Sequence, residues 1–148
     1  LERMRVTAEI KVVRAQSEPD ERAPWLLNID GRKVNTLIGR RGETLASLQY
    51  ITRLMTSRRL QRRTTIVVDV AGYKARRSKS LRDLANRMAE QAVRQSRTVT
   101  LEPMPPHERR IIHLALRNHP DVTTESVGEG DRRKVTVVPR RPKEGDGE

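Results

Sequence analysis

The chain has 148 residues, and its 31 Lys and Arg against 19 Asp and Glu give a formal net charge of +12. It contains no Cys, which excludes disulfides, thiolate zinc sites and a cysteine nucleophile. Hydrophobic residues make up 34% and aromatic residues 2%, a lean composition that still predicts folded modules with modest cores.

The positive charge is concentrated between Gly39 and Arg82, where twelve basic residues stand against two acidic ones. Such a concentration favours a polyanionic partner, nucleic acid first and an acidic membrane surface second. The alternative is a solvated surface in an arginine-rich chain. No segment has the apolar length of a membrane span and no secretory signal pattern opens the sequence. We therefore expect a cytoplasmic protein with no membrane span.

The first half predicts two strands, a helix and a third strand. Hydrophobic residues alternate from Met4 to Val12 and again from Trp25 to Ile29, which predicts an antiparallel pair, the first strand having one buried face. Apolar residues from Leu45 to Met55 then fall at helical spacing after a Gly39–Gly42 turn. Residues Thr64–Val70 return to a strand pattern.

The second half predicts a long amphipathic helix, a brief strand, a shorter helix and a hairpin. The shorter helix begins among prolines, which the first helical turn tolerates, and ends before Pro120. In chain order these elements are residues 73–97, Val99–Leu101, a helix from the Pro103–Pro106 region to about Asn118, and the strands Val122–Val127 and Lys134–Val138.

This order of elements predicts an α+β chain with two domains. The first domain is expected at residues 1–72 and the second, a small α/β domain, at 73–140. The long helix 73–97 opens the second domain and is shared between the two. Residues 141–148 are expected to form a disordered tail.

The segment Ile38-Gly39-Arg40-Arg41-Gly42 carries the most chemistry in the first half. Two glycines before a helix permit a tight turn and a close approach of a sugar-phosphate backbone, while helix N–H groups and two guanidinium groups attract anions. A P-loop is excluded because no Gly-Lys-Ser/Thr follows. Glycines at this spacing are common by chance, so the alternative is an ordinary strand-to-helix turn.

The run I-G-R-R-G-E-T-L-A-S-L-Q-Y-I resembles the core of a KH domain, whose GXXG loop holds single-stranded nucleic acid. The strand-strand-helix order before Thr64 resembles the type II arrangement of that domain. Scarce aromatic residues argue against an RRM or a cold-shock barrel, which bind bases on aromatic platforms. We expect Arg53, Arg58 and Arg59 to continue the nucleic-acid contacts along the helix that follows the loop.

In the second half, the candidate site residues are Arg109, Arg110 and His113. At helical spacing they share one quadrant with Arg117, while apolar residues such as Ile112 face the other way. This pattern predicts an apolar core face and a cationic outer face that offers adjacent donors to a phosphate. Taken alone, the pattern favours the simpler interpretation that His113 is an exposed residue of an amphipathic helix.

The stretch L-E-P-M-P-P-H-E-R-R-I-I-H-L-A-L, with the later G-E-G-D-R-R-K-V-T-V-V-P, resembles the Arg-xxx-His (R3H) domain, and Arg109 and His113 match the pair that names it. A KH domain followed directly by an R3H domain is the arrangement of the bacterial Jag family, also called SpoIIIJ-associated proteins or KhpB. The resemblance covers about Val6 to Pro139.

The resemblance implies single-stranded RNA binding by an RNA-binding or RNA-chaperone regulator connected with cell shape and cell-wall synthesis. It also implies a complex with a smaller KH-only protein. Single-stranded DNA as the ligand, a homodimer, and an adaptor role near the membrane insertase stay open as alternatives.

No catalytic constellation is visible, so we expect no enzymatic activity and no cofactor. His107, His113 and His119 are spaced by six residues, which separates them by about 120° on a helix. We therefore expect no metal site.

Overall fold

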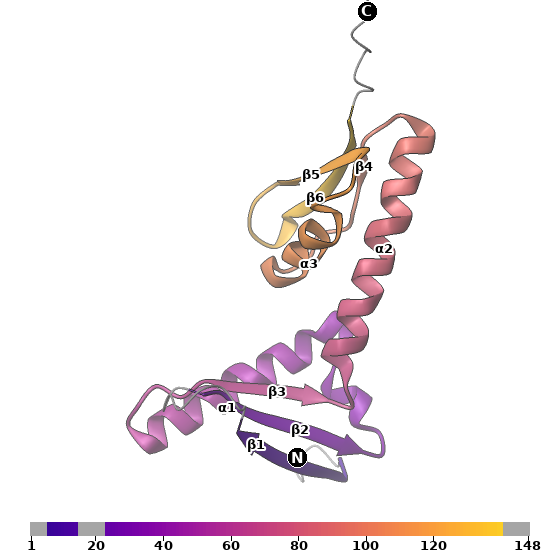
Figure 1. Cartoon of the computed structure of the whole chain (residues 1–148). Coiled ribbons are helices and arrows are strands. Elements are labelled where there is room, and N and C mark those ends of the chain that lie inside the picture. The colour runs from indigo at the N-terminus through magenta and orange to yellow at the C-terminus, as the bar shows by residue number, and fades with distance from the viewer. Residues whose placement is uncertain (1–5, 15–22, 141–148) are drawn as a thin grey trace, which may run out of the picture. The chain divides into compact units, whose positions relative to one another are not determined.

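The computed structural model describes residues 6–14 and 23–140, drawn in colour in Figure 1. The chain divides into two compact units, Leu1–Ala75 and Arg76–Glu148, called unit 1 and unit 2 below. Each unit contains one three-stranded sheet with helices, which confirms the predicted α+β fold class. Met4 of the predicted first strand and the predicted tail at 141–148 lie outside the described residues.

The sheet of unit 1 has the strand order β1-β2-β3. Strands β1 (Ala8–Arg14) and β2 (Trp25–Gly31) are antiparallel, as predicted, and β3 (Ile66–Val70) runs parallel to β2. Parallel neighbours need a crossover connection, which α1 (Glu43–Leu60) supplies between β2 and β3. Figure 1 shows these four elements in the indigo-to-magenta part of the chain.

The first strand does not have the buried face that its alternation predicted. Helix α1 packs on β3, where Ile66, Val68 and Val70 are at most 5% exposed. Ile10 and Val12 share a sheet face with these residues through the strand register, yet they are 48% and 56% exposed. Because β1 is the edge strand two places away from β3, the helix leaves it uncovered.

Helix α1 meets the sheet through polar as well as apolar groups. Leu45 at its start is buried, whereas Ile51 and Met55 further along the predicted apolar series are 53% and 68% exposed. The Val68 backbone N–H donates to Gln49 Oε1 at 3.0 Å. Gln49 therefore supplies an acceptor that a further strand would otherwise provide.

Helix α2 (Tyr73–Gln95) begins in the last three residues of unit 1 and continues in unit 2. Unit 2 also contains α3 (Pro106–Leu116) and a second sheet. Helix α3 ends two residues before the predicted Asn118. The sheet has the order β4-β6-β5, with both pairs antiparallel, and the predicted hairpin is confirmed. Its strands are β4 (Val99–Thr100), β5 (Val122–Val127) and β6 (Lys134–Pro139).

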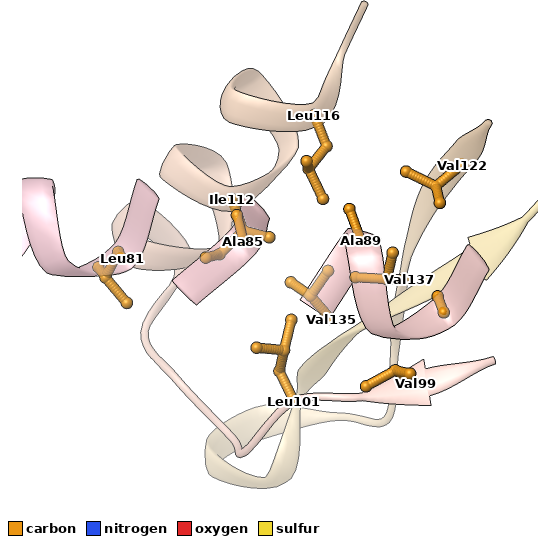
Figure 2. Close-up of a cluster of buried hydrophobic side chains, with 11 residues drawn as sticks. Leu81, Ala85, Ala89, Val99, Leu101, Ile112, Leu116, Val122, Val135 and Val137 are labelled. Carbon is orange, nitrogen blue, oxygen red and sulfur yellow. The ribbon is translucent and has the colours of Figure 1, made fainter. Parts of the chain in front are cut away.

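Small residues on α2 belong to the hydrophobic core of unit 2. Ala85, Ala89 and Ala92 are fully buried and recur at three- and four-residue spacing along one face of α2. Figure 2 shows the larger side chains that pack around them. These are Leu81, Val99, Leu101, Ile112, Leu116, Val122, Val135 and Val137.

A buried ion pair joins α2 to α3. Glu108 is 2% exposed, and its two carboxylate oxygens accept hydrogen bonds from Arg77 Nε at 2.7 Å and from Arg77 Nη2 at 2.9 Å. This two-point geometry fixes the guanidinium plane as well as the distance. Neither residue stood out in the sequence, because the two lie 31 positions apart.

Candidate nucleic-acid interface

The Gly39–Gly42 loop lies between β2 and α1 in unit 1. A hydrogen bond from Leu45 N to Ile38 O, 3.1 Å long, closes the loop at its base. Ile38 is 8% exposed and Leu45 is 3% exposed, so both ends are fixed in the unit 1 core. Apolar residues therefore anchor the loop at both ends.

Both glycines of the loop hold backbone conformations that other residues rarely adopt. Gly39 has φ +69° and Gly42 has φ +84°. A Cβ atom at Gly39 would collide with the Thr44 side chain, and one at Gly42 would lie 2.9 Å from Cε1 of Tyr73. A side chain at either position would therefore run into the protein itself, which explains why the turn needs glycine at both.

Positive charge surrounds this loop. Arg40 and Arg41 are exposed, and Arg41 itself has φ +52°. Helix α1 begins immediately afterwards, so the positive end of its dipole lies at the loop. Two of its first N–H groups already donate to loop carbonyls, Glu43 N to Arg40 O and Leu45 N to Ile38 O. Glu43 in the first turn offsets part of the field.

Lys74 connects the start of α2 to α1 beneath this region. Its ammonium donates to Gln49 Oε1 at 2.6 Å, and its backbone N–H donates to Asp69 Oδ1 at 3.1 Å. Burial lowers the pKa of Lys74, and the nearby Asp69 carboxylate raises it in part. The contacts hold Lys74 as a structural link on the loop side of unit 1.

The other arginines expected to bind nucleic acid are not beside the loop. Along the α1 axis, Arg53 lies about 15 Å and Arg59 about 24 Å from Glu43, at 1.5 Å per residue. Viewed down the helix, Arg58 is rotated about 140° from Arg53 and Arg59 about 120° the other way. All three are exposed, and the Arg53 guanidinium carbon lies 5.7 Å from the Tyr50 ring centre. They form a dispersed cationic surface and not a single line.

In unit 2 the structure brings Arg109 and His113 together against strand β5. His113 Nδ1 lies 2.7 Å from Thr124 Oγ1, and His113 Nε2 lies 2.9 Å from Ser126 Oγ. Arg109 Nη1 donates to the same Ser126 Oγ at 3.3 Å, and Arg109 Nε donates to Met104 O at 3.3 Å. We call Arg109, His113, Thr124 and Ser126 the α3–β5 cluster.

The predicted cationic outer face of this helix is wrong for Arg109 and His113, which are half-buried against β5. Arg110 and Arg117 are exposed as expected. Burial lowers the pKa of His113, and the neighbouring Arg109 guanidinium lowers it further. Both effects favour the neutral form of the imidazole.

Thr124 and Ser126 were missed by the sequence reasoning. Val122, Thr124 and Ser126 alternate with exposed residues on β5, so one face of this edge strand changes from apolar to polar along its length. The signal available in the sequence was that alternation, since Val122 is fully buried on the same face.

Within residues 6–14 and 23–140, no helix combines the length and apolar character needed to cross a bilayer. In the same part of the chain, no three His, Cys, Asp or Glu side chains gather as metal ligands would.

The chain matches known proteins over most of its length. The R3H domain model matches residues 79–139. An RNA-binding protein KhpB from Clostridium symbiosum is 41% identical over 115 residues, covering 78% of this chain and 52% of the relative. The KhpB of Bacillus subtilis is 35% identical over 116 residues, with 77% and 56% covered. The KhpB of Lactiplantibacillus plantarum is 36% identical over 115 residues, with 78% and 36% covered.

The chain spans about half the length of the first two of these relatives. The match to the R3H domain includes the whole α3–β5 cluster, since Arg109, His113, Thr124 and Ser126 all fall within residues 79–139. On these matches the chain is similar to the KhpB (Jag) proteins over about three quarters of its length, and residues 79–139 match an R3H domain.

Proposed function

We propose that the chain is a non-enzymatic module that binds single-stranded RNA. The Gly39–Gly42 loop acts as the GXXG loop of a KH domain, and the α3–β5 cluster provides a second contact. The observation that carries the proposal is the loop geometry, in which two positive-φ glycines expose main chain beside Arg40 and Arg41. KH loops of this kind hold about four backbone nucleotides.

The relatives support RNA as the ligand because they are named RNA-binding proteins. R3H is a nucleic-acid-binding domain, and its match covers residues 79–139. Two weak sites on one chain act together, since occupancy of one raises the effective concentration at the other. We include Arg53, Arg58, Arg59 and Arg110 as peripheral phosphate contacts.

The proposal extends to a role that rests on family resemblance. In this role the protein is a cytoplasmic regulator or RNA chaperone connected with cell shape and cell-wall synthesis, and it acts in a complex with a smaller KH-only protein. The domain assignment, a KH domain at 1–72 and an R3H domain at 73–140, belongs to the same proposal.

A second candidate is a protein-interaction adaptor, with the membrane insertase as the family-suggested partner. It is supported by large apolar side chains that α1 leaves exposed, among them Ile51, Leu54 and Met55 at 53%, 49% and 68%. Exposed apolar patches mark interaction surfaces. The two candidates differ in their dependence on Arg40 and Arg41, which an adaptor using this α1 surface does not need.

Fluorescence anisotropy with labelled single-stranded RNA, matched single-stranded DNA and duplex RNA over a salt series tests the proposal. The variant Arg40→Asp with Arg41→Asp is expected to weaken RNA binding more than tenfold while the thermal melt stays unchanged. Loss of two phosphate contacts also lowers the salt slope of log K by about 1.4, at about 0.7 per contact for single strands.

The matched control is Arg62→Asp with Arg63→Asp, which makes the same change of charge at exposed positions after α1. Its loss of affinity is expected to be smaller because it alters only the long-range field. Equal losses of RNA affinity in both variants would mean that the loop is only one part of a nonspecific basic surface. Unchanged RNA binding by the Arg40 and Arg41 variant favours the adaptor.

A further inference from the structure

The α3–β5 cluster contains more hydrogen-bond chemistry than the Arg109 and His113 pair alone. Both ring nitrogens of His113 contact a side-chain hydroxyl, one from Thr124 and one from Ser126. Ser126 Oγ also accepts a hydrogen from Arg109, which is always a donor. The protonation state of the imidazole therefore determines where the two hydroxyl hydrogens point.

A neutral His113 ring leaves one of these hydroxyl hydrogens available. With the proton on Nδ1, the ring donates to Thr124 and accepts from Ser126, so the Thr124 hydrogen is left over. With the proton on Nε2, the ring donates to Ser126 and accepts from Thr124, so the Ser126 hydrogen is left over. Both tautomers give the same number of outward donors.

A protonated ring changes this number. Both nitrogens then donate, both hydroxyl oxygens accept, and both hydroxyl hydrogens are available to a ligand. The ring also gains a positive charge beside the Arg109 guanidinium. Thr124, Ser126 and His113 are half-buried and not enclosed, so a ligand oxygen can reach them from solvent.

We propose that Thr124 and Ser126 contact the phosphate of a bound nucleic-acid strand directly, and that this strand binds to the cluster together with one proton on His113. The proposal rests on the proposed function and adds two ligand-binding residues and a pH dependence to it. The lowered pKa of His113 agrees with a cluster that is half-assembled at neutral pH and completed when an anion arrives.

The charged groups around His113 support an anion as the ligand. Glu108, the acidic residue nearest to Arg109 on α3, has its carboxylate occupied by Arg77. Glu125 lies between Thr124 and Ser126 on β5 and alternates to the opposite face of the strand. The remaining charged residues on α3, Arg109 and Arg110, are cationic, as are Arg117 directly after the helix and Lys134 on the neighbouring β6.

The ring signals of His113 in NMR spectra of the full chain provide the first test. We expect single-stranded RNA to raise the pKa of this ring, with the two ring nitrogens becoming equivalent in protonation. Linkage then requires RNA affinity to increase toward low pH by up to tenfold per pH unit. RNA binding that leaves the His113 titration unchanged overturns the inference and leaves the proposed function intact.

Side-chain replacements provide the second test, in a chain that already carries Arg40→Asp and Arg41→Asp so that the loop contributes little. Thr124→Val with Ser126→Ala is expected to weaken the remaining RNA affinity about tenfold at pH 6 and to abolish its pH dependence. Thr124→Ser with Ser126→Thr keeps both hydroxyls and is expected to retain both properties.

Thr123→Val is the matched control, because Thr123 is exposed on the opposite face of β5. Circular dichroism confirms that each variant is folded. Equal RNA affinity in the hydroxyl-free and hydroxyl-retaining variants overturns the inference. Absence of RNA binding by the unaltered chain overturns the proposed function as well, so the two failures are distinguishable.

Discussion

Replacing Arg77 by Leu removes the hydrogen-bond partner of both Glu108 carboxylate oxygens. Because the Glu108 side chain is 3% exposed, water cannot solvate the carboxylate that remains. Breaking a buried pair in this way costs about 3–5 kcal/mol. The Arg77 side chain is 27% exposed, so we expect a loss near the lower end, about 3 kcal/mol in the free energy of unfolding of unit 2.

Urea unfolding of the full chain followed by amide hydrogen exchange measures this loss, since exchange reports on unit 2 residue by residue. Lys79→Leu, at an exposed position of the same helix, is the control and is expected to change stability by less than about 0.5 kcal/mol. Arg77→Leu combined with Glu108→Leu is expected to recover most of the loss, because no buried charge is left unpaired. A loss below about 1 kcal/mol for Arg77→Leu, the level of a surface pair, would refute the reasoning.

Three further predictions concern the cores and His113. Ile112→Ala is expected to cost about 2–5 kcal/mol in urea unfolding, against little for the half-exposed Leu114→Ala, and similar losses would contradict the packing shown in Figure 2. Gly42→Ala forces φ +84° on a residue with a Cβ and is expected to destabilise unit 1 by about 1–3 kcal/mol, measured by the fluorescence of Trp25; an unchanged midpoint would contradict it. The lowered pKa of His113 means that the unfolded chain binds more protons just below pH 6.5, so stability falls as pH drops through this window. In His113→Gln, thermal stability is expected to change less with pH across this range than it does in the unaltered chain. The same pH dependence in both proteins would contradict the assignment.

The elements with strong local periodicity were predictable from the sequence. The hairpin strands Val122–Val127 and Lys134–Pro139 follow a period-two pattern on a sheet, and the alanines of α2 follow the helical period. The loop was predictable as well, because Gly39 and Gly42 are the residue type that positive φ angles favour.

Burial in unit 1 could not be predicted from the same patterns. The alternation in β1 is real, but only the position of α1 over β3 decides that Ile10 and Val12 stay exposed. Likewise, the spacing of apolar residues on α1 did not indicate that Gln49 would bond to the β3 backbone. These outcomes depend on which element packs on which, and periodicity within one segment carries no information about it.

The candidate site of unit 2 was predictable in its motif and not in its chemistry. Arg109 and His113 were identified from their spacing, whereas Thr124 and Ser126 come from another element, 11 and 13 positions after His113. Their hydroxyls turn an expected solvent-facing surface into a hydrogen-bonded cluster. Glu108 was missed for the same reason, since its partner lies on α2.

The strand order of unit 2 has a consequence for how the chain is synthesised. Strand β6 lies between β4 and β5, although it follows both of them in the sequence. During translation, β4 and β5 therefore have no neighbour to pair with until Pro139 has been added, whereas unit 1 is complete at Ala75. At about 5–20 residues per second, the ribosome needs about 3–13 s to cover that interval. Between the completion of α2 at Gln95 and that of β6 at Pro139, the apolar face of α2 lacks its sheet, and the nascent chain is exposed to proteases and chaperones.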